Sequence, residues 1–360
     1  MFPPPLAREK VAVPMPNRRS RLSYVSDTEP GYTRQRRGKR FVYLDRRGRA
    51  IRDDRVLARI RSLAIPPAYT DVWICRSPHG HVQATARDAR GRKQYRYHPD
   101  WKAWRDATKF ERTLEFARAL PKLRGRIALD LRRKGLARER VLATLLRLLD
   151  RTHVRIGNEE YARSNRSYGL STLRDRHARV RGDEVLLHFR GKSGKVHQVA
   201  LTDARVARVV RRCEDLPGQH LFQYRDEEGA LHRVGSADVN DYLREIAGNG
   251  FTAKDFRTWA ATVSVAGSLI AHGKASEAML RAAIERAATE LGNTPAVCRR
   301  AYVHPAIMQA YASPEQAGRL RAAFERAANQ RGRGLSQIEK AVLIYLRRAM
   351  ARAPRSPKGS

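Results

Sequence analysis

Cysteine is scarce in this chain of 360 residues, and the three that occur, Cys75, Cys213 and Cys298, stand far apart. Because they show no CxxC spacing, they indicate neither a disulfide-stapled fold nor a zinc site, and they suit a reducing cytosol. No apolar run approaches the roughly 18 residues that a membrane span needs. The N-terminal residues also lack the apolar stretch of a signal peptide. We therefore expect a soluble, cytoplasmic protein.

Several kinds of catalytic equipment are also missing from the sequence. There is no HExxH motif, no DxD cluster and no Cys/His ligand spacing, so two-metal nuclease chemistry has little support. There is no GxxxxGK[ST] loop, which argues against an ATP-driven motor. We expect neither a metal ion nor a nucleotide cofactor.

Acidic residues are few relative to basic ones: 36 Asp and Glu stand against 73 Lys and Arg, which gives a net charge of +37. A field of this sign favours a polyanionic partner, because each neutralised phosphate releases condensed counterions. The excess of Arg over Lys points the same way, since guanidinium forks match phosphate oxygens. A basic surface without such a partner, or codon bias, would produce the same composition. Charge therefore predicts nucleic-acid binding but no mechanism.

The pattern along the chain predicts an α+β protein, with a small antiparallel β domain followed by a larger, mostly helical domain that contains a β-hairpin. Residues 1–39 are rich in Pro and Arg and are expected to form a basic arm with little structure. We place the β-rich domain at 40–108, the helical domain at 109–352 and a frayed tail at 353–360. Strands are expected at 41–44, 71–75, 81–87 and 93–97, a hairpin at 183–200, and helices at 53–62, 100–119, 121–134, 138–152, 203–214, 236–247, 254–270, 276–291, 295–311, 314–330 and 335–352.

Four segments carry side chains suited to breaking a phosphodiester. That reaction without a metal needs cations at the nonbridging oxygens, a proton donor for the leaving oxygen and a nucleophile. Each segment alone has an ordinary reading, namely a helix-end Arg, a solvated turn Lys, an exposed helix Arg or a core Tyr. The segments are RIGNEEY at 155–161 with YGLSTL at 168–173, FRGKSGK at 189–195, KDFRTW at 254–259 and LGNTPAVCRRAYVHP at 291–305.

Taken in this order, the four segments resemble the catalytic motifs of type IB DNA topoisomerases of the poxvirus-type and bacterial branch. The resemblance implies the catalytic fold shared by tyrosine recombinases and these topoisomerases. It implies that Tyr302 is the nucleophile and that Lys192, on the hairpin turn, is the general acid, with Lys195 a competitor for that role. The remaining catalytic residues would be the charge-stabilising Arg155, Arg257 and Asn293.

One position departs from the poxvirus-type pattern. Those enzymes carry His where this chain has Asn293, whereas the bacterial branch resembles this chain there. Asn can donate a hydrogen bond but cannot take up a proton, so Asn293 is expected to act only electrostatically.

A milder resemblance concerns contacts with DNA. The segment GRKQYRYH at 91–98 is similar to the strand that this family lays in a DNA groove. On such a strand Arg92 and Gln94 point away from Tyr95 and Tyr97, although a strand with one buried Tyr face fits as well. Further DNA contacts are expected from Asn158, Tyr161, Lys195 and Lys254.

The resemblance implies an enzyme that relaxes supercoiled double-stranded DNA through a 3′-phosphotyrosyl intermediate, without ATP or metal. It would work in the nucleoid as a monomer clamped around the duplex. A tyrosine recombinase shares this chemistry but usually has HxxR where this chain has Lys254-x-x-Arg257. A basic nucleoid protein without enzymatic activity is the alternative from another class.

Overall fold

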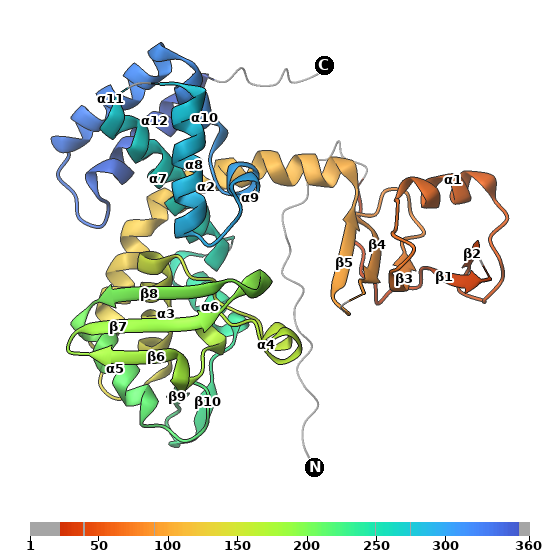
Figure 1. Cartoon of the computed structure of the whole chain (residues 1–360), viewed down its shortest axis with the longest axis horizontal. Coiled ribbons are helices and arrows are strands. Elements are labelled where there is room, and N and C mark those ends of the chain that lie inside the picture. The colour runs from red at the N-terminus through yellow and green to blue at the C-terminus, as the bar shows by residue number, and fades with distance from the viewer. Residues whose placement is uncertain (1–21, 39, 90, 249, 274, 353–360) are drawn as a thin grey trace. The chain divides into compact units, whose positions relative to one another are not determined.

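The structure is a computed structural model that describes residues 22–38, 40–89, 91–248, 250–273 and 275–352, without the side chains of 103–109 and 352. Of the predicted arm at 1–39, residues 1–21 and 39 lie outside the described residues, as does the predicted tail at 353–360. The chain divides into two compact units, Met1–Lys109 and Phe110–Ser360. Helix α2 (Pro99–Asp130) contains the boundary between them (Figure 1).

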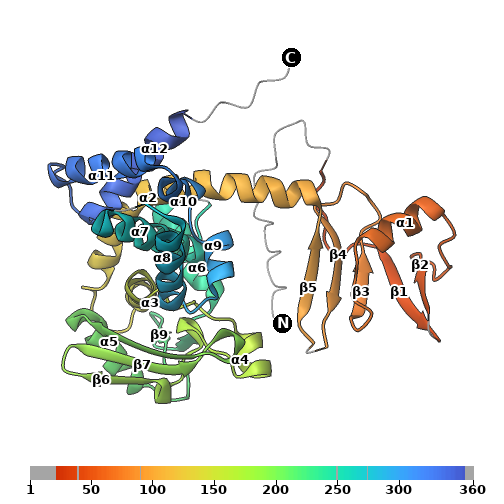
Figure 2. The same ribbon diagram turned by 45° about the horizontal axis from the view of Figure 1, so that its top comes forward.

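The first unit is a five-stranded antiparallel sheet in the order β2-β1-β3-β4-β5, with helix α1 beside it (Figure 2). Its small core joins Ile60 of the helix to Ile74 and Ala84 of the sheet. Asp53 fixes the start of α1, because its carboxylate accepts the N–H groups of the first turn. The elements are β1 (Tyr32–Arg37), β2 (Arg40–Leu44), α1 (Asp54–Ser62), β3 (Thr70–Ile74), β4 (Val82–Arg87) and β5 (Lys93–Tyr97).

Strand β1 corrects the prediction that the whole of 1–39 is an arm with little structure. It lies inside the sheet, paired with β2 on one side and β3 on the other. Arg34 is held there because its guanidinium donates to the carbonyls of Ile65, Pro66 and Tyr69 and lies 4.3 Å from the ring centroid of Phe41. Pairing with two neighbouring strands satisfies the backbone N–H and C=O groups of β1 whatever its side chains are. The Pro- and Arg-rich composition therefore gave the wrong prediction for this segment.

The second unit is mostly helical and contains a three-stranded antiparallel sheet in the order β6-β7-β8 and a short β9-β10 ribbon. Val185, Leu187 and Phe189 of β7 are buried in its core, and helices α3 and α5 pack against the sheet (Figure 1). The strands are β6 (Ala178–Arg181), β7 (Glu184–Arg190), β8 (Val196–Thr202), β9 (Gln223–Arg225) and β10 (Leu231–Arg233). The helices that follow α2 are α3 (Arg138–Thr152), α4 (Glu159–Asn165), α5 (Ala204–Glu214), α6 (Ser236–Ala247), α7 (Ala253–His272), α8 (Glu277–Glu290), α9 (Pro295–Ala301), α10 (Pro305–Ala312), α11 (Pro314–Ala328) and α12 (Gln337–Arg352), with short 3-10 turns η1 (Leu170–Thr172), η2 (Asp175–His177) and η3 (Lys192–Gly194).

Two helix predictions differ from the structure, both at a proline. The helices expected at 100–119 and 121–134 form one continuous helix, α2, through Pro121. The single helix expected at 295–311 is broken into α9 and α10 at residues 302–304. Pro305 disfavours helical geometry at the residue before it, and His304 instead caps α10 by accepting the N–H of Ala306 at 3.1 Å.

Helix α7 lies at the centre of the second unit. It contacts α3, α6, α8, α10, α11 and α12, and Phe256, Trp259 and Val265 on it are buried. Arg257, which α7 carries between Phe256 and Trp259, is therefore held by packing on several sides. In the part of the chain that the structure describes, no helix combines the length and apolar character that crossing a bilayer requires.

Candidate active site

Tyr302 lies at the junction of α9 and α10. It ends α9 as the C-cap, where its N–H donates to the carbonyl of Cys298 at 2.9 Å. Its own carbonyl accepts the hydroxyl of Thr262, on α7, at 3.1 Å. The phenol is therefore carried by a fixed inter-helix turn and not, as the sequence suggested, by the middle of a helix.

Arg257 is the buried cation beside this tyrosine. It is only 4% exposed, and its Cζ lies 5.4 Å from the centroid of the Tyr302 ring. Its guanidinium donates to the backbone carbonyl of His153 and, at 2.8 Å, to that of Leu291. Its Nε is buried without a hydrogen-bond partner among the described residues. Burial and the charge of Arg155 lower the pKa of Arg257 to about 10, although the neighbouring Tyr302 raises it in part.

Arg155 and Asn293 form the next part of the cluster. The Arg155 guanidinium donates to the side-chain oxygen of Asn293. Asn293 is 8% exposed, and its amide nitrogen is buried with no hydrogen-bond partner among the described residues. A buried donor left unsatisfied costs about 1–3 kcal/mol, so a bound acceptor at this amide would recover that free energy.

Two glycines explain how Arg155 is held. Gly157 has a φ of +109°, a region that favours glycine. A Cβ on Gly169 would lie 2.5 Å from the carbonyl oxygen of Arg155. The two segments approach this closely because Leu170 donates its N–H to the Arg155 carbonyl at 2.8 Å. The spacing of the RIG and YGL motifs thus reflects a direct contact between their backbones.

The two lysines of the hairpin turn differ in their surroundings. The Lys195 ammonium donates to the backbone carbonyl of Asn293 at 3.0 Å. Lys192 is exposed in η3, at the tip of the β7–β8 hairpin. The turn is tight, with Ser193 at a φ of 63° and Gly194 at 76°. The structure therefore brings Lys195 to the cluster and leaves Lys192 at its edge.

The cluster changes the acidity of Tyr302. Burial by itself raises the pKa of this phenol, but the nearby charges of Arg257, Arg155 and Lys254 outweigh burial, so its pKa lies below the ordinary value of 10.0. Lys254 is exposed in the first turn of α7. Deprotonation of Tyr302 thus places a negative charge where three cations lower its free energy.

The predicted DNA-contact residues of the second unit lie in a short helix after Arg155. Asn158 is the N-cap of α4, and its side-chain oxygen accepts the N–H of Tyr161 at 3.2 Å. The Tyr161 side chain is 43% exposed. Asn158 therefore has a capping role, while Tyr161 presents a free aromatic surface.

In the first unit, the predicted alternation on β5 is present. Tyr95 and Tyr97 are exposed, and their rings are stacked with centroids 5.8 Å apart. Arg92 and Gln94 instead both donate to the carboxylate of Asp88, at 2.8 and 2.9 Å. The alternative of a buried Tyr face on this strand is therefore wrong.

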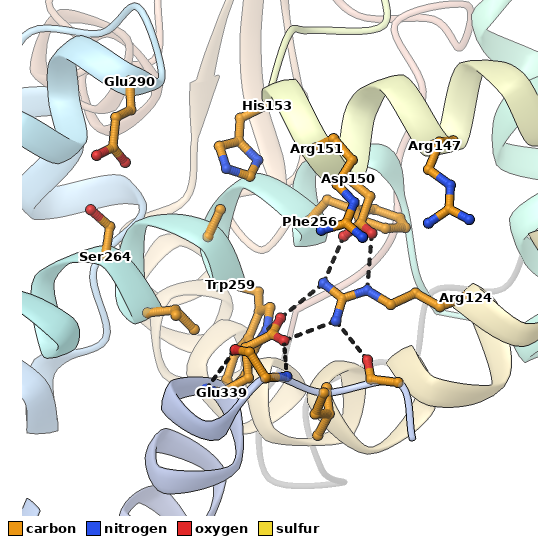
Figure 3. Close-up of a pocket in the computed structure, with 15 residues that line it drawn as sticks. Arg124, Arg147, Asp150, Arg151, His153, Phe256, Trp259, Ser264, Glu290 and Glu339 are labelled. Carbon is orange, nitrogen blue, oxygen red and sulfur yellow. Dashed lines mark hydrogen bonds and ion pairs between the residues drawn. The ribbon is translucent and has the colours of Figure 1, made fainter. Parts of the chain in front are cut away.

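An ion network supports α7 beside Arg257. Arg124 bonds Asp150 and Glu339 with four contacts of 2.9 Å, and Glu339 also accepts the indole N–H of Trp259 at 3.0 Å (Figure 3). The network joins α2, α3, α7 and α12. No motif in the sequence predicts this network, because no regular spacing relates its members.

The chain matches two family models of DNA topoisomerases. The family model described as the catalytic core of eukaryotic DNA topoisomerase I matches residues 98–330, and that of the N-terminal domain of bacterial DNA topoisomerase IB matches residues 40–88. DNA topoisomerase 1B of Acanthamoeba polyphaga mimivirus is 32% identical over 295 residues, which span 78% of this chain and 87% of the viral protein. DNA topoisomerase 1B of Vaccinia virus (strain Copenhagen) is 20% identical over 229 residues, 62% of this chain and 70% of its own.

The chain therefore belongs to the type IB DNA topoisomerases, and is an isomerase that acts on DNA. Within that family it falls in the poxvirus-like and bacterial branch. This membership confirms the predicted fold class and decides against a recombinase and against a nucleoid protein without activity.

Proposed function

We propose that this enzyme relaxes supercoiled double-stranded DNA by cutting and resealing one strand with Tyr302. The Tyr302 phenol loses its proton to solvent and its oxygen attacks the scissile phosphorus. The bond from phosphorus to the 5′ oxygen breaks, that oxygen takes up a proton, and a 3′-phosphotyrosyl link and a 5′ hydroxyl result. The observation that carries this proposal is the convergence of Arg155, Arg257 and Asn293 on Tyr302 from segments far apart in the sequence.

In this scheme Arg155, Arg257 and Asn293 stabilise the negative charge that develops on the nonbridging oxygens. Two donors, Arg257 Nε and Asn293 Nδ2, have no partner among the residues that the structure describes, and a bound phosphate would supply the missing acceptor. A donor of this kind is typically worth about 10²–10³ in rate. Asn293 acts only by donating, since an amide does not take up a proton.

We assign protonation of the leaving 5′ oxygen to Lys192. The ammonium of Lys195 is already engaged with the Asn293 carbonyl, whereas Lys192 is exposed at the tip of the hairpin turn. Catalytic hydrogen bonds often form only in the substrate complex, so the exposed position of Lys192 is compatible with this role.

DNA binding in this scheme rests on the net charge of +37 and on exposed aromatic and basic side chains. These are Tyr95 and Tyr97 in the first unit, and Tyr161 and Lys254 in the second. We further propose that one copy of the chain clamps the duplex. The phosphotyrosyl bond retains the energy of the broken bond, so resealing needs no ATP, and rotation between the two steps removes supercoils.

Plasmid relaxation tests the proposal. Negatively and positively supercoiled plasmids are incubated with the protein in EDTA without ATP, beside Tyr302→Phe, and analysed after protease treatment. We expect both plasmids to relax, the variant to be inactive, and both proteins to shift DNA equally. Relaxation by Tyr302→Phe, or a requirement for metal or ATP, would refute the tyrosyl mechanism.

A further inference from the structure

His197, on β8, lies between the two loops that carry the hairpin lysines and Asn293. A Cβ built on Gly191, at the start of the turn, would lie 2.6 Å from Cδ2 of its imidazole. A Cβ built on Gly292, next to Asn293, would lie 2.5 Å from its Cε1. The ring therefore touches the backbone of both loops, and glycine at these positions makes the double contact possible.

The rest of its surroundings fix the ring in this place. The imidazole is stacked on Phe189 of β7, with centroids 5.1 Å apart and planes inclined by 8°. Lys195, which directly precedes β8, donates to the Asn293 carbonyl at 3.0 Å. His197 and Lys195 thus join the hairpin to the 291–293 loop through two adjacent contacts.

The imidazole is neutral near pH 7. Burial lowers its pKa below the ordinary value of 6.5, and the charges of Arg155, Arg257 and Lys195 lower it further. The contacts that the structure gives this ring are its stack on Phe189 and its close approach to Gly191 and Gly292. Its contribution is therefore made by shape and packing and not by charge or proton transfer.

We infer that His197 is a positioning residue, which sets the hairpin turn against the Asn293 loop and so places the proton-donating turn lysine at the leaving oxygen. This inference rests on the proposed function. It predicts that loss of His197 acts on the protonation step. A misplacement of about 1 Å at a reacting group can cost about 10² in rate.

The test measures single-turnover cleavage on a duplex whose scissile site has first been mapped. One substrate has the ordinary 5′ oxygen and the other has sulfur in that bridging position. A thiolate leaves without protonation because thiol pKa values are about 8.5. We expect His197→Ala to slow cleavage of the oxygen substrate by about 10² and to approach the wild-type rate on the sulfur substrate.

The matched control is Gln198→Ala, since Gln198 is the exposed next residue of the strand, and we expect it to cleave both substrates at the wild-type rate. His197→Gln keeps a flat, neutral end group and is expected to recover part of the oxygen-substrate rate, which a proton-transfer role would not allow. Equal slowing of His197→Ala on both substrates would overturn the inference.

The two proposals can fail separately. If neither Lys192→Ala nor Lys195→Ala is rescued by sulfur, the assignment of a lysine as proton donor fails. If one of them is rescued and His197→Ala is not, the proposed function stands and the positioning role of His197 is wrong. DNA-binding affinity and thermal unfolding of each variant, measured in parallel, separate these outcomes from loss of the fold.

Discussion

Replacing Arg124 by Met should destabilise the second unit strongly, because it leaves two buried carboxylates without their cation. Arg124 contacts Asp150 and Glu339, whose side chains are 5% and 8% exposed, and also donates to the Gly334 carbonyl at 2.6 Å. Breaking a buried ion pair by removing one partner costs about 3–5 kcal/mol. That is a large share of a typical unfolding free energy of about 5–15 kcal/mol.

The comparison variant is Glu339→Gln, which keeps the Arg124–Asp150 pair and removes only one charge. Its expected cost is about 1.5–3 kcal/mol, the range for a hydrogen bond to a charged group. Urea unfolding followed by circular dichroism at the helical band measures both variants. Equal losses in the two variants, or a loss below about 1 kcal/mol in Arg124→Met, would refute the argument from stranded charge.

The pH dependence gives the same prediction a second test. In the native protein burial raises the pKa of Glu339, but Arg124 outweighs burial and the pKa lies below 4.5. Glu339 therefore contributes stability above that pH and loses it as the pH falls. In Arg124→Met burial prevails and the pKa rises, so acidification relieves the repulsion. The difference in unfolding free energy between the two proteins should shrink as the pH is lowered towards 4.5.

Three further predictions concern single positions. Asn293→Asp places a carboxylate where a phosphate binds, so single-turnover cleavage should be slower than in Asn293→Ala, itself slowed by about 10²–10³; a faster Asp variant would contradict the electrostatic role. Gly169→Ala puts a Cβ 2.5 Å from the Arg155 carbonyl oxygen and should lower the melting temperature, whereas Gly125→Ala, with open space around its Cβ, should not. Burial and the charges of Arg176 and Arg174 lower the pKa of His177 to about 4 from 6.5, so the unfolding free energy should fall as the pH drops between those values, and His177→Gln should flatten that slope in a pH series of urea titrations.

Local pattern predicted the elements whose signal lies in their own residues. The β7–β8 hairpin and most helices have clear apolar periodicity and turn residues, and the structure contains them. Strand β1 has no such signal, because its place in the sheet is set by β2 and β3. The break between α9 and α10 could have been read from Pro305, which disfavours helix at His304.

The candidate site also combines residues that the sequence predicted with contacts that it did not. The four motifs predicted Tyr302 and its partners through family resemblance, and no spacing in this chain alone brings Arg155 to Asn293. Other parts of the site involve backbone atoms, such as the His153 carbonyl that holds Arg257. Every residue has a backbone carbonyl, so the residue types in a sequence do not show which carbonyl will bind a side chain. His197 left only an indirect sign, a glycine in each of the two loops it touches.

The hydroxyl of Thr262 has a mechanical consequence for the proposed reaction. The oxygen of this fully buried side chain on α7 lies 2.8 Å from the Thr258 carbonyl and 3.1 Å from the Tyr302 carbonyl, which share its one proton, and it accepts the N–H of His304 at 3.1 Å. During strand rotation the cut DNA end would pull on the enzyme through Tyr302 alone. These contacts hold the backbone directly after the Tyr302 Cα, so part of the torque would pass into α7, and α9, only seven residues long, would not bear the load by itself.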